Sequence, residues 1–355
     1  MSTRDIATSI GLSPKDVIRM DTNTSPYLPR KHLSALAKKM TNLRVNDYPD
    51  TSYVDLRNSL SRYCGIGINR FVITSGADEA LDIIAKTLLD SHDEVVIPNP
   101  TYSMFRVVSE IMDSRVLFVP RKKEFKKDNF AVDVDEIARK VSDKTKIIFI
   151  CNPNNPTGNS TSQSDVEFLL DSCPGATIVI DEAYYEFSGR TLVNLTEKSD
   201  NVLIVRTFSK AFSMAGARVG YIVASEKAAE NLNIVRPPNS LSVISLALAQ
   251  ASLEDLDTML ENVRAIVGER ERCVNAMRGI PQIEVFPSEA NFILFQLKNE
   301  KSSENIHKAL MKHGFVLRNF SETPVIEGCL RVTINTRTVN DSFLRALSEA
   351  LSNNT

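Results

Sequence analysis

The 355-residue sequence has no tryptophan, only four histidines, and five cysteines without a CxxC pair. The cysteines are odd in number and widely spaced, which argues against a disulfide framework and favours a reducing compartment, the cytoplasm. The histidines make no metal-ligand spacing with cysteine or carboxylate, so we expect no bound metal. The sequence therefore predicts a cytoplasmic protein held together by its core alone.

Long hydrophobic runs and an excess of one charge are also absent. No apolar run approaches the roughly 20 residues needed to cross a bilayer, so no membrane partner is expected. Arg4 and Asp5 precede any apolar stretch, which argues against an ordinary signal peptide. The net charge is −2 without a basic stripe, so nucleic acid is not expected as a main partner.

Between about residues 70 and 224, short apolar runs alternate with segments of helical periodicity, such as 78–89, 101–112, 133–141 and 162–171. Strand–helix alternation implies crossover connections and a mostly parallel sheet covered on both faces. The expected strands are 71–74, 94–97, 116–119, 147–150, 177–180, 202–205 and 220–223.

After about residue 240 the pattern changes to two long helical segments, 243–253 and 255–278, and then to a mixture of strand-like runs and helical segments. This mixture predicts a smaller α/β domain with strands at 283–286, 291–297, 315–318 and 329–334 and helices at 302–313 and 339–351. The first 40 residues contain one amphipathic segment, 30–40, and are too few for a core, so we expect them to pack on the C-terminal part. The predicted organisation is an N-terminal segment 1–43, a large domain 44–275 and a small domain 276–355.

Lys210 follows the apolar run 202–205 and so lies just past the C-terminal end of a predicted strand, where open α/β sheets bind ligands. Thr207, Ser209 and Arg218 supply hydroxyl and guanidinium groups beside this amine. The combination suits a phosphate-bearing aldehyde, with which Lys210 would form a Schiff base while its neighbours hold the phosphate. A solvated surface lysine is the alternative.

Asp181 directly follows the apolar run 178–180, again at the C-terminal end of a predicted strand. A carboxylate there could pair with the nitrogen of a pyridine ring and keep that nitrogen protonated. Tyr184 could donate a hydrogen bond to the phenolic oxygen of the same ring. A simple helix cap is an equally good interpretation of this segment taken alone.

The segment 152–158 follows the predicted strand 147–150, and its two prolines and one glycine predict a tight turn. Such a turn would hold Asn155 rigidly enough to contact the phenolic oxygen too, although a purely structural turn is the alternative. The segment 74–80 contains Gly-Ala-Asp-Glu and joins a strand to a helix, so the backbone N–H groups of Ala77 and Asp78 could bind a phosphate. Tyr102 could stack on a flat ring or belong to the core.

In chain order these motifs resemble fold-type I pyridoxal-phosphate enzymes, and they are most similar to class I/II aminotransferases of the histidinol-phosphate aminotransferase group. The resemblance runs from about residue 20 to 350. It implies an α/β fold with a mostly parallel seven-stranded sheet in a large domain and a smaller α/β C-terminal domain. Its most specific segments are Ser209–Phe212 with Gly216 and Arg218, Asn155–Gly158, Asp181–Tyr184, Gly76–Glu79 and Cys329–Thr333.

The resemblance implies pyridoxal 5′-phosphate as cofactor, an amino donor, and a 2-oxo acid acceptor such as 2-oxoglutarate. Lys210 would be the Schiff-base lysine and the catalytic acid and base, with Asp181 and Tyr184 beside it. Tyr48 matches a tyrosine that reaches the cofactor phosphate of the neighbouring subunit, which implies a homodimer. The remaining implied cofactor contacts are Ala77, Asp78, Tyr102, Asn155, Thr207, Ser209 and Arg218.

For the substrate, the resemblance implies Arg331 as the carboxylate-binding residue, Arg318 as a phosphate-binding residue, and Tyr27 as a tyrosine that closes over the substrate. Two arginines also fit the two carboxylates of glutamate. The chain departs from the group's pattern at Asn23-Thr24-Ser25-Pro26 and at Asn335. An aromatic aminotransferase, a threonine-phosphate decarboxylase and a non-catalytic ligand sensor are the alternatives, although the intact lysine, aspartate and tyrosine disfavour a sensor.

Overall fold

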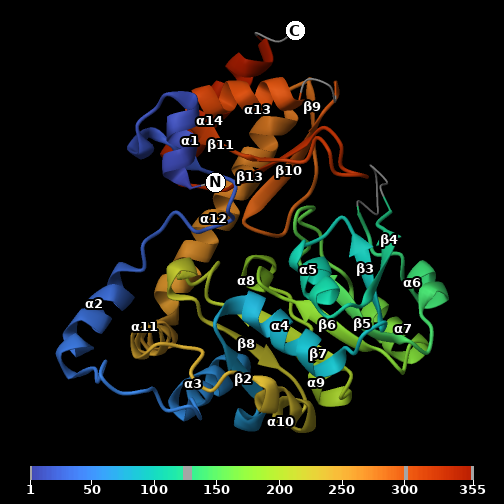
Figure 1. The fold of residues 1–355 in the computed structure, drawn as a ribbon. Helices are drawn as coiled ribbons and strands as arrows, with labels where there is room; N and C mark the ends of the chain where they lie inside the picture. Colours follow the sequence, from blue (N-terminus) through green and yellow to red (C-terminus); the bar gives the residue numbers. More distant parts are fainter. Residues whose placement is uncertain (1, 123–129, 300–302, 353–355) are drawn as a thin grey trace.

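A seven-stranded sheet forms the centre of the computed structural model, which describes residues 2–122, 130–299 and 303–352 (Figure 1). The strand order is β2-β8-β7-β6-β5-β3-β4. β8 runs antiparallel to both of its neighbours, and the other pairs are parallel. The predicted mostly parallel sheet is therefore confirmed, with strands β2 (Phe71–Thr74), β3 (Glu94–Asn99), β4 (Arg115–Pro120), β5 (Thr145–Cys151), β6 (Thr177–Asp181), β7 (Val202–Thr207) and β8 (Gly220–Val223).

The central strands are apolar on both faces because each face is buried in a different core. In β6, Val179 lies in one hydrophobic cluster, while Ile178 and Ile180 lie in the other. This alternation follows from the two-residue period of a strand. One face is covered by α4 (Gly76–Leu88), α5 (Met104–Ile111) and α10 (Glu226–Val235), and the other by α3 (Val54–Cys64), α6 (Val134–Lys140) and α7 (Gln163–Ser172).

The C-terminal part forms a smaller α/β unit around an antiparallel sheet of order β12-β13-β10-β9. The predicted strand 315–318 is split, because β11 pairs with the N-terminal β1 and β12 with β13. The long helix α12 (Leu256–Arg278) leads from the large unit to this one (Figure 1). The other elements are β1 (Ile18–Arg19), β9 (Ile283–Val285), β10 (Phe292–Leu297), α13 (Ser303–Lys312), β11 (Phe315–Val316), β12 (Arg318–Asn319), β13 (Cys329–Thr333) and α14 (Arg337–Ser352).

The N-terminal segment divides between the two units. α1 (Thr3–Ile10) packs on the C-terminal unit, where Ile6 and Val17 share a cluster with Val316. α2 (Arg30–Lys39) lies instead along α11 (Val243–Glu254), and His32 contacts the carbonyl oxygen of Asp255 at 3.1 Å. Of the first 40 residues, which were expected to pack on the C-terminal part, α1 lies on that unit and α2 lies against α11. The predicted domain boundaries remain a prediction.

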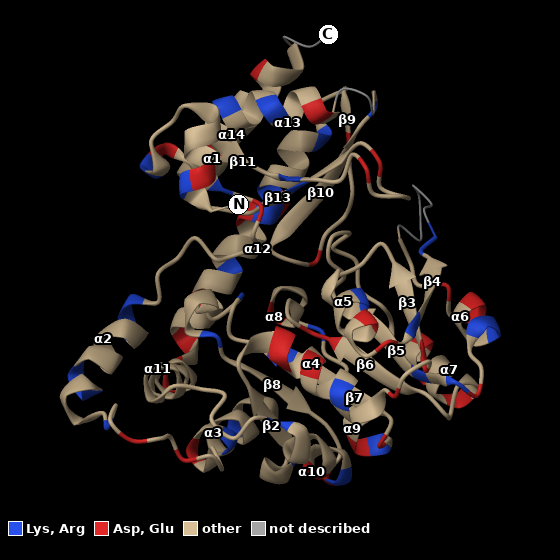
Figure 2. Ribbon diagram, viewed as in Figure 1, with Lys and Arg blue, Asp and Glu red and all other residues tan. Residues whose placement is uncertain are grey.

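Basic and acidic residues are interspersed over both units (Figure 2). None of the helices within the described ranges is long and apolar enough to cross a membrane.

Candidate active site

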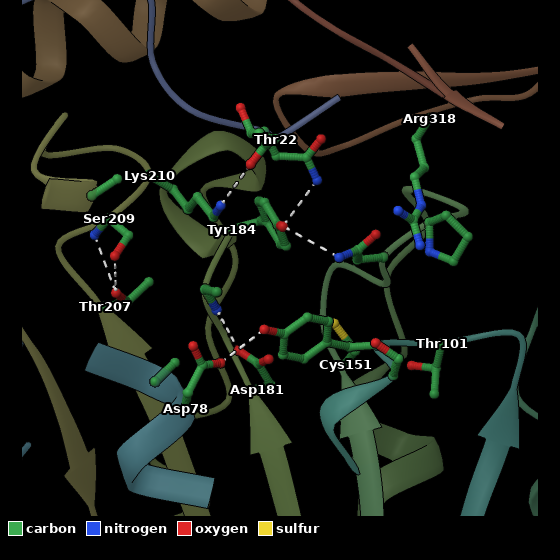
Figure 3. Close-up of a pocket in the computed structure, with 18 of the residues that line it drawn as sticks. Thr22, Asp78, Thr101, Cys151, Asp181, Tyr184, Thr207, Ser209, Lys210 and Arg318 are labelled. Atoms are coloured by element: carbon green, nitrogen blue, oxygen red, sulfur yellow. Dashed lines mark hydrogen bonds between the residues drawn. The ribbon is translucent and has the colours of Figure 1, made fainter. Parts of the chain in front are cut away.

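A cavity of about 340 Å³ lies between the two units, at the C-terminal ends of β5, β6 and β7 (Figure 3). Its walls come from three parts of the chain: the strap 21–23, the loops after the large-sheet strands, and the small sheet. This is the edge of an open α/β sheet at which ligands bind. The predicted residues that line it are Ala77, Asp78, Tyr102, Asn155, Asp181, Tyr184, Thr207, Ser209, Lys210, Arg218, Arg318 and Arg331.

Lys210 extends into the cavity from the loop that follows β7. Its Nζ donates a hydrogen bond to the carbonyl oxygen of Thr22 at 3.1 Å and lies 5.7 Å from the centre of the Tyr184 ring. Burial, followed by the positive charge of Arg331, lowers the pKa of Lys210 to about 8. An amine with a lowered pKa is a better nucleophile and base near neutral pH.

Asp181 closes the bottom of the cavity at the end of β6, with 2% of its surface exposed. Its Oδ1 accepts a hydrogen bond from the backbone N–H of Ala183 at 2.9 Å. Burial raises the pKa of this carboxyl to about 7. A buried carboxyl of high proton affinity is suited to share a proton with a ring nitrogen.

An anion cradle lies on one side of the cavity, where β2 meets α4. The first N–H groups of a helix have no partner within the helix, so the start of α4 attracts an anion. Thr207 Oγ1 and Ser209 Oγ are 2.9 Å apart, and Arg218 Nη2 lies 3.3 Å from Asp78 Oδ2. Backbone N–H groups, two hydroxyls and a guanidinium are the kinds of donor that bind a phosphate.

The cradle requires glycine at two positions. A Cβ on Gly76, whose φ is +80°, would lie 2.6 Å from Nη2 of Arg218. A Cβ on Gly220 would lie 2.5 Å from the carbonyl carbon of Gly76. Real side chains do not approach so closely, so the two absent side chains let Arg218 and the start of α4 meet.

Tyr102 and Tyr184 stand on the cavity wall. Tyr102 donates a hydrogen bond to Asp78 Oδ1 at 2.8 Å. The hydroxyl of Tyr184 accepts hydrogen bonds from Nδ2 of Asn23 at 3.0 Å and from Nδ2 of Asn155 at 3.5 Å (Figure 3). Burial raises the pKa of both tyrosines, so both are neutral hydrogen-bond donors at neutral pH.

Arg331 and Arg318 lie opposite each other on β13 and β12, so they share one face of the small sheet. Arg331 donates hydrogen bonds to Oδ1 of Asn155 and, at 2.6 Å, to the carbonyl oxygen of Asp21. Burial lowers the pKa of Arg331 to about 10. Both guanidinium groups are 5.9 Å from the centre of the Phe320 ring, which places two cations at the substrate side of the cavity.

Two predicted residues are not among those that line the cavity in the described chain. Tyr48 is 84% exposed. Tyr27 packs against the main core. The predictions that Tyr48 reaches the site of a neighbouring subunit and that Tyr27 covers the substrate both stay predictions.

Several lining residues were not predicted, among them Asn23, Thr101, Cys151 and Phe320. Asn23 belongs to the extended segment 21–27, whose departure from the group's pattern was visible in the sequence. Nothing local to that segment, however, indicates which side chain turns toward the cavity.

The chain belongs to the class I and II aminotransferase family, whose model matches residues 15–347. Among curated relatives, the histidinol-phosphate aminotransferase of Ruminiclostridium cellulolyticum is 36% identical over 336 residues, covering 93% of this chain and 91% of that protein. The histidinol-phosphate aminotransferase of Methanocaldococcus jannaschii is 34% identical over 356 residues, covering 99% of this chain and 94% of that protein.

Solved structures show the same fold. The histidinol-phosphate aminotransferase of Sinorhizobium meliloti, in complex with pyridoxal-5′-phosphate, superposes with a TM-score of 0.90, 24% identity, and coverage of 100% of this chain and 95% of that one. The histidinol-phosphate aminotransferase of Clostridium acetobutylicum superposes with a TM-score of 0.86 and 26% identity, and the match covers 96% of this chain and 100% of that one. The predictions of the fold, of a pyridoxal-phosphate-dependent aminotransferase and of its cofactor are confirmed.

Proposed function

We propose that the protein is a histidinol-phosphate aminotransferase, which converts L-histidinol phosphate and 2-oxoglutarate to imidazole-acetol phosphate and glutamate. The observation that carries this proposal is the similarity to curated histidinol-phosphate aminotransferases at 32–36% identity over nearly the whole of both chains. The two facing arginines of the small sheet support it, because a phosphorylated donor and a dicarboxylic acceptor both need cationic partners.

The lining residues fit pyridoxal phosphate, which supplies an aldehyde that joins a primary amine and a ring that accepts electrons. Lys210 would be the amine for that aldehyde, and Asp181 would hold a proton at the ring nitrogen. Tyr184 and Asn155 would contact the ring oxygen, and Tyr102 would stack on the ring. The backbone of Ala77 and Asp78 and the side chains of Thr207, Ser209 and Arg218 would hold the phosphate.

Lys210 also moves the proton of the reaction. Its Nζ, whose lowered pKa makes the neutral form more accessible near neutral pH, takes the proton from the α-carbon of the amino substrate and later gives it up. Arg331 and Arg318 orient the substrate through its anionic groups, and Tyr27 closes over it. The site excludes water when these groups and the strap surround the substrate.

We further infer a homodimer, in which Tyr48 reaches the phosphate site of the partner subunit. The support is an exposed tyrosine among other exposed apolar side chains near the start of the large unit, including Met40, Val45 and Val54. Isolated exposed apolar residues are ordinary, but a group of them indicates an interface. We also infer the cytoplasm, supported by free thiols at Cys64, Cys151, Cys173 and Cys273.

An absorbance scan of the purified, pyridoxal-phosphate-loaded protein tests the substrate. Histidinol phosphate, added without an acceptor, should convert the lysine-bound cofactor to its amine form, and 2-oxoglutarate should reverse the change. Lys210→Ala should lose at least about 10³-fold in kcat because it has no amine to move the proton.

The alternatives give different results in the same scan. A change with phenylalanine but not with histidinol phosphate would favour an aromatic aminotransferase. Loss of carbon dioxide from threonine phosphate would favour a decarboxylase. Near-normal turnover by Lys210→Ala would contradict the assignment of the lysine.

A further inference from the structure

Asn23 is a buried polar residue whose hydrogen bonds tie three separate parts of the chain together. It is 2% exposed, and its backbone lies in the left-handed region with a φ of 53°. Its N–H donates to Thr333 Oγ1 at 3.0 Å, and its carbonyl oxygen accepts from Nδ2 of Asn291 at 3.0 Å. The side chain then reaches the hydroxyl of Tyr184 at 3.0 Å (Figure 3). A strap residue is thus placed against the candidate catalytic tyrosine.

The orientation of the Asn23 amide is determined by its neighbours. Thr333 Oγ1 receives the Asn23 N–H, and its own proton goes to Oδ1 of Asn23 at 3.2 Å. With Oδ1 as the acceptor in that bond, Nδ2 is the group that faces Tyr184, and it donates to the hydroxyl there. The same reasoning applies to Asn155, whose Oδ1 accepts from Arg331 and whose Nδ2 therefore faces Tyr184.

Two amide donors at one phenol oxygen determine where the phenol's proton can go. A hydroxyl oxygen accepts two hydrogen bonds and donates one. Because Asn23 and Asn155 both present N–H groups to Tyr184, neither can accept its proton. That proton is left to point into the cavity, into which Lys210 also extends.

We propose that Asn23 is a positioning residue, which directs the hydroxyl proton of Tyr184 toward the phenolic oxygen of bound pyridoxal phosphate. This inference depends on the proposed contact of Tyr184 with that oxygen and is independent of which amino substrate the enzyme uses. The strap then has two roles: it lines the cavity, and through Asn23 it orients a hydrogen bond to the cofactor.

The strap also couples Tyr184 to the strand that carries the substrate-binding arginine. Thr333 and Arg331 are two residues apart on β13 and so lie on the same face of that strand. Arg331 contacts Asp21 of the strap, and Thr333 contacts Asn23. β13 is therefore bonded to the strap at two residues, one of which, Asn23, also bonds the hydroxyl of Tyr184.

A pH titration of the bound cofactor's absorbance tests the inference without any amino substrate. A hydrogen bond to the phenolic oxygen draws negative charge from it and so weakens its hold on the nearby proton of the Lys210–cofactor imine. Asn23→Gly keeps the positive φ and removes the side-chain donor. Its titration midpoint should rise by roughly half to one pH unit, the effect of a weakened hydrogen bond.

A double-mutant cycle separates this role from a general effect on the strap. In a Tyr184→Phe background, Asn23→Gly should cause no further shift, because the hydroxyl through which it acts is gone. Thr24→Ala, directly after the strap, should leave the midpoint unchanged. The dissociation constant of pyridoxal phosphate, measured in parallel, should rise in Asn23→Gly and not in Thr24→Ala.

Two outcomes would overturn the inference. One is a midpoint that stays at the wild-type value in folded Asn23→Gly. The other is a shift of equal size with and without the Tyr184 hydroxyl. If Asn23→Gly does not fold, Thr333→Val provides a second test, since it removes the hydroxyl that donates to Oδ1 of the Asn23 amide and accepts from the Asn23 backbone N–H. A protein that lacks activity toward histidinol phosphate but binds the cofactor would leave this experiment fully interpretable.

Discussion

Lys210 and Asp181 face the same cavity, and burial shifts their pKa values in opposite directions. Burial raises the pKa of Asp181 to about 7 and lowers that of Lys210 to about 8, so both shifts favour the neutral form. Burial takes water away from both groups. A charged ring nitrogen would give Asp181 a partner in place of that water, and a reactive aldehyde would give one to Lys210. The shifted pKa values of Asp181 and Lys210 thus suit a ligand that carries a ring nitrogen and an aldehyde.

The pH dependence of cofactor loading follows from the Lys210 shift. Only the neutral amine attacks an aldehyde, and a lowered pKa makes that form abundant at lower pH. The loading rate of cofactor-free protein, followed by stopped-flow absorbance, should rise with pH and level off above about 8. Arg331→Gln should move the midpoint upward, because the positive charge of Arg331 is the second cause of the shift. A wild-type midpoint near 10.5 would contradict the prediction.

At the scale of elements, the site depends on how strand ends are joined. Arg206 precedes Thr207 on β7 and forms a buried ion pair with Glu182, which follows Asp181, at 2.8 Å. Since neighbouring residues of a strand point to opposite faces, this pair lies behind the cavity while Thr207 and Asp181 face it. The ion pair thereby joins the ends of β6 and β7, which the strand ladder already pairs in register.

Gly220 provides a second test at this scale. The atoms nearest to its Cβ would be backbone atoms of Gly76, which cannot move aside as a flexible side chain would. Gly220→Ala should destabilise the protein by about 1–3 kcal/mol and weaken cofactor binding at least about tenfold, since α4 and Arg218 are displaced. Urea unfolding and a pyridoxal-phosphate titration measure the two effects.

The matched control is Gly175→Ala, where a Cβ would meet no described atom within 4 Å. It should change stability by less than about 0.5 kcal/mol and leave cofactor affinity as it is. Equal effects of the two substitutions would show that the contact with Gly76 is unimportant.

At the scale of the whole molecule, the proposed dimer predicts complementation between two defective variants. Lys210→Ala lacks the amine, and Tyr48→Ala lacks the group that we place in the partner's phosphate site. In a mixed dimer, one site combines the intact Lys210 of one subunit with the intact Tyr48 of the other. Unfolding the two variants together and refolding them should restore turnover that neither shows alone. Turnover equal to the sum of the separately refolded variants would contradict a shared site.

Much of the fold could be predicted because its causes are local. β2 and β8 were expected at 71–74 and 220–223, and the structure has them there, since a short apolar run is typical of a strand buried on both faces. α3 and α10 were not predicted. Each buries only two residues, Leu56 and Leu60 or Ala229 and Leu232, which is too few for a clear helical period.

The sequence by itself determined the chemistry of this protein: an amine, a carboxyl and anion-binding groups, each just after a buried strand. These motifs are local, and parallel strands necessarily bring their ends to one edge of the sheet. Only the tertiary structure decided that Asn23 meets Tyr184 and Thr333, which lie 161 and 310 positions away in the chain. Such contacts depend on how the N-terminal strap is packed between the two units, and no short segment carries that information.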